Sequence, residues 1–163
     1  MAVECTLTYS FYPIEEPPGE PENANCAALN LGSVKSILIV DDSPLIRRTL
    51  RTLLAQQADW SVCGEAENGR DGIDKALQLK PDLIVIDLVM PVLNGIEASR
   101  VLKRLMPTTP LVMFTTFTDP YVKEEALAAG VKAVIPKSEG TTSLIGSIQQ
   151  LLGSKGPVSD HAA

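Results

Sequence analysis

The sequence contains few aromatic residues, few cysteines and no long apolar run. Phe, Trp and Tyr make up 4% of the 163 residues, and the three cysteines (Cys5, Cys26 and Cys63) lack CxxC spacing. An odd set of this kind indicates neither a zinc site nor a disulfide framework. No apolar run approaches the ~20 residues that span a bilayer, and the start of the chain lacks the basic residues of a secretion signal. We therefore expect a soluble, cytoplasmic protein that does not enter a membrane.

Positive charge is also scarce. The formal net charge is -6, and residues 1–34 contain five glutamates but no Lys or Arg. Subtracting these five from the 20 acidic residues leaves 15, against 14 basic residues in the remainder of the chain. Because binding to a phosphate backbone depends on clustered Lys and Arg, no direct binding to nucleic acid is expected.

The composition divides the chain into three parts. Residues 1–34 include the Pro- and Glu-rich stretch EEPPGEPENANC, and they predict a disordered acidic leader, or an artefact such as a fusion remnant or an upstream start codon. Residues 35–153 are long enough to close one ordinary hydrophobic core. Residues 154–163, which contain the only histidine, His161, predict a flexible tail.

From Lys35 onward, short apolar runs alternate with helical patterns. The runs predict five strands, namely Ser36–Val40, Trp60–Ala66, Leu83–Asp87, Leu111–Thr115 and Lys132–Pro136. Apolar residues recur at helical spacing after each strand and predict five helices, with Asn68-Gly69 as a turn before the second. Continuously apolar strands are buried on both faces, and helical crossovers require parallel strands with right-handed connections. The expected fold is an open, doubly wound α/β sheet.

Five polar side chains fall where these predicted strands end. They are Asp41 and Asp42 after the first strand, Asp87 at the end of the third, Thr115 at the end of the fourth and Lys137 after the fifth. Ligands of such sheets bind outside the carboxyl ends of the strands. Neighbouring carboxylates repel one another, and a hard divalent cation such as Mg²⁺ offsets that repulsion. Each residue alone has an ordinary structural explanation, such as helix capping by Asp42 or Ser43 before Pro44, but their common edge favours a site.

These residues also carry a resemblance to a known family. The residues that match in identity are Asp41-Asp42, Asp87 followed by Met90-Pro91 and Gly95, Thr115 and Lys137. Their separations match as well, with 45 residues from Asp42 to Asp87, 28 from Asp87 to Thr115 and 22 from Thr115 to Lys137. Over Lys35–Leu152 the chain resembles the receiver domain of two-component response regulators. The stretch GEAENGRDG (Gly64–Gly72) is most similar to receivers that precede a LuxR-type DNA-binding domain.

The resemblance implies a flavodoxin-like fold with strand order 2-1-3-4-5 and five helices. It implies that Asp87 accepts a phosphoryl group from a phosphohistidine of a sensor histidine kinase or histidine phosphotransfer protein. Mg²⁺, or Mn²⁺, would be held by Asp41, Asp42, Asp87 and the backbone carbonyl of Val89, while Lys137 and Thr115 would contact the phosphoryl group. The fourth helix, fifth strand and fifth helix would then control a downstream protein or a homodimer. Such a protein is a signalling switch that catalyses its own phosphorylation and dephosphorylation, not a turnover enzyme.

Three other interpretations remain open from the sequence. The chain could be a pseudo-receiver that binds partners without phosphorylation, or the N-terminal fragment of a DNA-binding transcription regulator. It could also be an aspartate-nucleophile phosphatase, although such enzymes usually carry a second aspartate two residues after the nucleophile, where this chain has Val89.

A few positions depart from the family pattern. Thr116 stands where the family commonly has a small residue, and Val134 stands where it has an aromatic one. Ser138 stands where a proline or an acidic residue is usual. Val89 and Phe117 are apolar where faster-hydrolysing receivers often hold a polar group, which predicts a long-lived phosphoryl state. Three arginines on the first predicted helix (Arg47, Arg48 and Arg51) predict a solvent-exposed basic face, with contact to an acidic kinase surface as the alternative.

Overall fold

A computed structural model describes residues 33–117 and 119–153. Residues 1–32 of the predicted leader lie outside this range, as does the predicted tail with His161. The elements run β1 (Lys35–Val40), α1 (Pro44–Leu54), β2 (Trp60–Ala66), α2 (Gly69–Leu79), β3 (Leu83–Ile86), α3 (Gly95–Leu105), β4 (Leu111–Thr115), α4 (Pro120–Ala128), β5 (Ala133–Pro136), a 3-10 turn (Lys137–Glu139) and α5 (Thr141–Leu152). Across these described ranges, no helix is both long and apolar enough to cross a bilayer.

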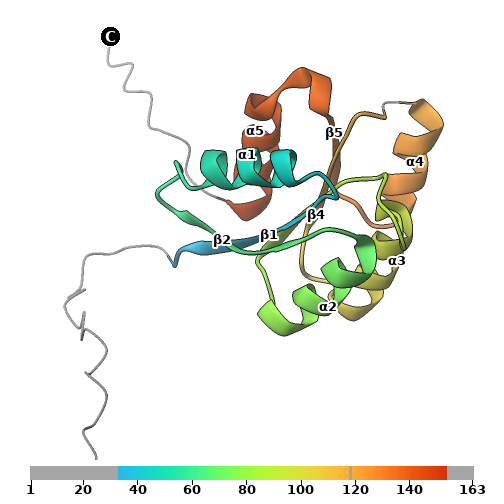
Figure 1. The fold of residues 1–163 in the computed structure, drawn as a ribbon, viewed down its shortest axis with the longest axis horizontal. Helices are drawn as coiled ribbons and strands as arrows, with labels where there is room; N and C mark the ends of the chain where they lie inside the picture. The colour runs from blue at the N-terminus through green and yellow to red at the C-terminus, as the bar shows by residue number, and fades with distance from the viewer. Residues whose placement is uncertain (1–32, 118, 154–163) are drawn as a thin grey trace, which may run out of the picture. The chain divides into compact units, whose positions relative to one another are not determined.

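The five strands form one parallel sheet in the order β2-β1-β3-β4-β5. β3 is the central strand of the five, and Figure 1 shows helices on both sides of the sheet. The order changes direction between β1 and β3, because the chain first adds β2 on one side of β1 and then β3 on the other. The predicted doubly wound class, the strand order and the five helices are confirmed.

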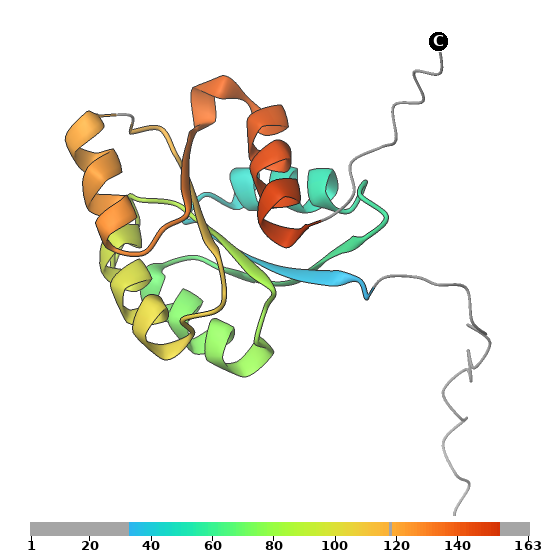
Figure 2. The same ribbon diagram turned by 180° about the vertical axis from the view of Figure 1, so that it is seen from behind.

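Two hydrophobic clusters fill the space between the sheet and its helices. On one face, α1 and α5 place Leu50, Leu54, Leu144 and Ile148 against the sheet, each at most 1% exposed. On the other face, α2, α3 and α4 cover the alternate strand residues, among them Leu38, Ile84 and Met113. Figures 1 and 2 show this division from both sides. Because the strands are buried on both faces, their sequences read as continuous apolar runs.

The helix and strand ends correct several details of the sequence prediction. Of the two N-cap candidates for α1, Asp42 and Ser43, it is Ser43 that caps the helix, as the sequence allowed, with its hydroxyl accepting the backbone N–H of Ile46 at 3.4 Å. Asn68 is the N-cap of α2 and not part of a separate turn, since its side-chain oxygen accepts the N–H of Asp71 at 2.9 Å. β3 ends at Ile86, so Asp87 lies in the loop beyond the strand. A 3-10 turn that the sequence pattern did not predict begins at Lys137.

Candidate functional site

The register of the central strands brings two distant aspartates together. Val40 of β1 pairs with Ile86 of β3, so the next residues, Asp41 and Asp87, leave the sheet side by side. The backbone N–H of Asp87 donates to the carbonyl of Val40 at 2.8 Å, which extends the ladder by one bond beyond the strand. The two apolar strands therefore hold both carboxylates at the carboxyl edge of the sheet.

Asp41, Asp42 and Asp87 form an acidic cluster. One carboxylate oxygen from each residue lies within 4.8 Å of the other two. Asp41 and Asp87 are 2% and 7% exposed, whereas Asp42 is open to solvent. One oxygen of Asp41 accepts the N–H of Ser43 at 2.9 Å, which fixes the direction of this carboxylate. The predicted acidic residues are thus brought together, with two of them buried.

Lys137 supplies the positive charge at this cluster. Its ammonium group lies 2.7 Å from Asp41 Oδ2 and 3.2 Å from Asp87 Oδ2. Thr115 of β4 pairs with Pro136 of β5, and this register carries Lys137 to the same edge. The ammonium also lies 5.9 Å from the centroid of the Phe114 ring, within range of a cation–π contact. One ammonium facing three carboxylates leaves an excess of negative charge.

Burial and these charges shift two pKa values. Burial raises the pKa of Asp87 above its ordinary value, the charge of Asp41 raises it further, and Lys137 opposes the shift. Burial alone would lower the pKa of Lys137, but its hydrogen bond to Asp41 and the charges of Asp87 and Asp41 outweigh that effect and raise it. Lys137 is therefore a permanent cation at neutral pH, and Asp87 gains from any further positive charge nearby.

Thr115 ends β4 with its side chain fully buried. Its hydroxyl oxygen accepts the backbone N–H of Phe117 at 3.2 Å. The hydroxyl hydrogen remains able to donate to an acceptor, because accepting one hydrogen bond leaves it free. Thr116 and Phe117, the residues that follow, are exposed to solvent. The hydroxyl therefore ties the edge of the sheet to the start of the β4–α4 loop.

The loop after Asp87 is held close to the carboxylate. The backbone N–H of Leu88 donates to Asp87 Oδ1 at 2.8 Å, and the N–H of Gly95 donates to the carbonyl of Leu88 at 2.8 Å. A Cβ atom on Gly95 would overlap the carbonyl oxygen of Asp87, so only glycine permits this approach. Val89 is half exposed in the same loop; the metal-binding role of its carbonyl stays a prediction.

The sequence prediction was wrong about one arginine. Arg48 and Arg51 are exposed, as a solvated face requires, but the side chain of Arg47 is only 17% exposed and turns back toward the acidic loop. It donates to the backbone carbonyl of Asp41 at 2.7 Å and to Glu65 of β2 at 3.3 Å. Helical spacing assigns a face to a residue but not the path of a long side chain, so no pattern in the sequence indicated this contact.

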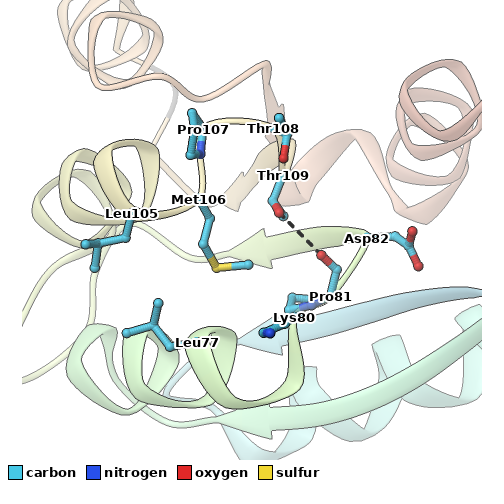
Figure 3. Close-up of a pocket in the computed structure, with 9 residues that line it drawn as sticks. All are labelled: Leu77, Lys80, Pro81, Asp82, Leu105, Met106, Pro107, Thr108 and Thr109. Carbon is cyan, nitrogen blue, oxygen red and sulfur yellow. Dashed lines mark hydrogen bonds between the residues drawn. The ribbon is translucent and has the colours of Figure 1, made fainter.

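A separate hollow of about 520 Å³ lies at the other end of the strands. It is lined by Leu77, Lys80, Pro81, Asp82, Leu105, Met106, Pro107, Thr108 and Thr109. Figure 3 shows these side chains and the hydrogen bond of 3.4 Å from the Thr109 hydroxyl to the carbonyl of Pro81. Its lining residues come just before β3 and β4, so this hollow contains none of the predicted site residues.

Comparison with known proteins gives a consistent result. The family model of the response regulator receiver domain matches residues 37–149. A protein-glutamate methylesterase/protein-glutamine glutaminase from Hahella chejuensis is 42% identical over 119 residues, which are 71% of this chain and 30% of that protein. The response regulator protein VraR from Staphylococcus saprophyticus is 35% identical over 114 residues, 70% of this chain and 54% of that protein. The chain thus spans between about a third and a half of these relatives.

A solved structure extends the likeness to the fold. The response regulator domain of CheB from Thermotoga maritima matches with a TM-score of 0.70 and 32% identity, covering 76% of this chain and 99% of that one. The relatives include the LuxR-like regulators that the sequence suggested, and also methylesterases, which it did not suggest. The matched span contains all the residues of the acidic cluster and Lys137. This chain belongs to the response regulator receiver family of two-component systems.

Proposed function

We propose that this protein is a phosphorylation-dependent switch in which Asp87 accepts a phosphoryl group from a phosphohistidine of a sensor histidine kinase or histidine phosphotransfer protein. The observation that carries the proposal is the placement of Asp87: it is 7% exposed, lies 3.2 Å from the Lys137 ammonium and shares a cluster with Asp41 and Asp42. A buried carboxylate between an ammonium and two acidic groups contributes nothing to the hydrophobic core, and it suits a group that reacts with an anion in the presence of a cation.

The acidic cluster fits a hard divalent cation, Mg²⁺ or Mn²⁺. Three carboxylates with ligand oxygens within 4.8 Å of one another supply the donor type that Mg²⁺ prefers, and Lys137 balances only one of the three charges. Asp41, Asp42 and Asp87 would hold the ion, together with the backbone carbonyl of Val89. When bound, the ion supplies positive charge that stabilises the oxygens of the transferring phosphoryl group.

The side chains of the site divide the work of the transfer. A carboxylate oxygen of Asp87 attacks phosphorus; the P–N bond of the phosphohistidine breaks as the P–O bond forms, and the donor returns to histidine. Lys137, anchored on Asp41 at 2.7 Å, lies close enough to Asp87 to pair with an oxygen of the phosphoryl group. Phosphoryl transfer of this loose, in-line kind depends mainly on positioning and charge compensation, which fits a site without a histidine.

Phosphorylation would reach the surface through Thr115. Its buried hydroxyl would donate to a phosphoryl oxygen and pull on the β4–α4 loop, to which it is already bonded at Phe117. The face formed by α4, β5 and α5 would then change its affinity for a downstream protein or a second copy of the chain. Phe117 and Tyr121 are 50% and 73% exposed beside this loop and suit such a contact.

The receiver would comprise residues 35–153 and act in the cytoplasm. Both compared relatives are longer than the matched region. This supports a receiver that controls an output module through its phosphorylation, with the module on the same polypeptide or on another. A pseudo-receiver is less well supported, because Asp41, Asp42, Asp87, Thr115 and Lys137 are all present and, apart from the exposed Asp42, buried or half-buried at one edge.

The test is the intact mass of the protein after incubation with acetyl phosphate and Mg²⁺. We expect a gain of one phosphoryl group that is lost with EDTA and in Asp87→Asn. Asp82→Asn is the matched control, because Asp82 lies at the opposite end of the same strand. No gain in folded wild-type protein that binds Mg²⁺ would overturn the proposal in favour of a pseudo-receiver.

A further inference from the structure

The backbone of the acidic loop is held by an arginine that does not belong to the acidic cluster. Arg47 lies in the first turns of α1, and its Nη1 donates to the carbonyl of Asp41 at 2.7 Å and to the carbonyl of Asp42 at 3.2 Å. The Nε of the same guanidinium donates to Glu65 Oε2 at 3.3 Å. Arg47 thus joins the loop after β1 to the neighbouring strand β2 through one planar group.

Asp42 depends on this contact more than Asp41 does. The carboxylate of Asp41 is fixed by Ser43 and Lys137, and its backbone N–H donates to Ala66 at 3.0 Å. For Asp42, by contrast, no side-chain hydrogen bond or ion pair is found among residues 33–117 and 119–153. Its direction is set by its backbone, and the bond from Arg47 restrains the carbonyl of that backbone.

Resting on the proposed function, we propose that Arg47 is a positioning residue for the cation site. The two bonds from its Nη1 fix the backbone of Asp41 and Asp42, so that the exposed Asp42 carboxylate would face the divalent ion. Glu65 fixes the guanidinium in turn. A guanidinium suits this role because its donors are held in a rigid plane, whereas a lysine ammonium is a point charge on a flexible stem.

A positioning role and a simple charge effect of Arg47 predict opposite changes in Mg²⁺ affinity when the arginine is removed. A positive charge near a cation site weakens binding of the cation, so if Arg47 acted only through its charge, Arg47→Gln would tighten Mg²⁺ binding. If Arg47 positions Asp42, Arg47→Gln weakens Mg²⁺ binding, on the order of tenfold, as is typical when a group that orients a metal ligand is removed. The sign of the change therefore decides between the two.

The chain offers a matched control. Arg51, on the same helix as Arg47, donates to the other carboxylate oxygen of Glu65. Within the part of the chain that the structure describes, it makes no bond to the loop that carries Asp41 and Asp42. Arg51→Gln therefore removes an ion pair to the same partner without releasing the loop. A contact that served only stability would make the two variants alike in Mg²⁺ affinity.

The experiment is calorimetric titration of the full chain with Mg²⁺, repeated with Mn²⁺ by electron paramagnetic resonance, and urea unfolding in EDTA. We expect Arg47→Gln to bind both ions more weakly, Arg47→Lys to recover little of the loss, and Arg51→Gln to bind as wild type does. Equal or tighter binding by Arg47→Gln, or full recovery in Arg47→Lys, would overturn the inference while leaving the proposed function standing.

Two further outcomes keep the inference open to disproof. If Arg47→Gln fails to fold, Glu65→Gln takes its place. It removes the negative charge that pairs with the guanidinium, and it should weaken Mg²⁺ binding in a protein that circular dichroism shows to be folded. Unchanged binding in folded Glu65→Gln would then count against the inference. If wild-type protein binds neither ion, the proposed function fails and this inference fails with it.

Discussion

The ammonium group of Lys137 lies 2.7 Å from a carboxylate oxygen of Asp41, although 96 positions separate the two residues in the chain. Their side chains are 14% and 3% exposed. The pair joins the loop after β1 to the turn after β5, across β3 and β4, the two strands that lie between them in the sheet. Since one ammonium also serves Asp87, removing it would leave two buried carboxylates without a cation.

Lys137→Gln should therefore destabilise the protein in the absence of metal. Breaking a buried ion pair by removing one partner typically costs about 3 kcal/mol or more, because the remaining charge stays buried. We expect urea unfolding in EDTA to show a loss of this size, and saturating Mg²⁺ to restore part of it by binding the folded state. Lys132→Gln, which removes an exposed lysine just before β5, is the control. Equal losses in the two variants would contradict the prediction.

Asp82 should make stability depend on acid pH. Its carboxylate accepts hydrogen bonds from the backbone N–H and the hydroxyl of Ser36, at 2.8 and 3.0 Å, and from Lys35. The bond from the Ser36 N–H is the main cause that lowers the pKa of Asp82. A lowered pKa in the folded state gives stability that is present above the unfolded pKa of about 3.9 and is lost as pH falls through the folded pKa.

Asp82→Asn should accordingly cost most stability near neutral pH, and the cost should shrink as the medium becomes strongly acidic. The free energy of unfolding in urea, measured at a series of pH values for both proteins, checks this. Asp74→Asn is the control, because Asp74 forms an exposed pair with Arg70. A constant difference between wild type and Asp82→Asn at every pH would be inconsistent with the lowered pKa.

Val92 should be replaceable with a gain in stability. It has a φ of 69° in the loop between β3 and α3, and its side chain is 82% exposed. A β-branched residue is strained in this left-handed region, whereas asparagine adopts it more readily. We expect Val92→Asn to raise the free energy of unfolding by about 1 kcal/mol, with Val92→Ala giving a smaller rise. No increase in the denaturation midpoint of Val92→Asn would show that the loop relaxes at no cost.

If Asp87 accepts a phosphoryl group as proposed, the phosphorylated state should be long-lived. Val89 and Phe117 are 52% and 50% exposed beside the site, and neither side chain can hydrogen-bond a water that attacks phosphorus. We expect Val89→Asn to shorten the half-life of the phosphoprotein after removal of acetyl phosphate, followed by intact mass, and Val89→Ala to leave it near that of wild type. A wild-type half-life of seconds in Mg²⁺ buffer would refute the prediction.

The fold and the place of the site were predictable because both depend on periodicity. Apolar runs bounded by turn residues located the strands, and strand ends located Asp87, Thr115 and Lys137 at one edge. The pairing of Val40 with Ile86 was not predictable, because the neighbours of a strand depend on the crossing of the chain and not on its local pattern. The strand order came from the resemblance to the receiver family alone.

The directions of individual side chains could not be predicted from the sequence either. The pair Asn68-Gly69 is as typical of a turn as of a helix start, and the choice was made by the Asn68 side chain reaching the N–H of Asp71. Arg47 follows the spacing of an exposed face, yet it folds back because two carbonyls and Glu65 lie within its reach. Such choices depend on what surrounds the residue after the chain has folded.

Because β5 lies at an edge of the sheet, the parts of the site should differ in their resistance to local unfolding. Asp41 and Asp87 follow β1 and β3, each of which is paired on both sides, whereas Lys137 follows β5, which pairs with β4 alone. Outer strands open at lower free energy than central ones. Amide hydrogens next to Asp41 and Asp87 should therefore exchange with solvent far more slowly than those leading to Lys137. The lysine can then fluctuate while the two carboxylates stay fixed.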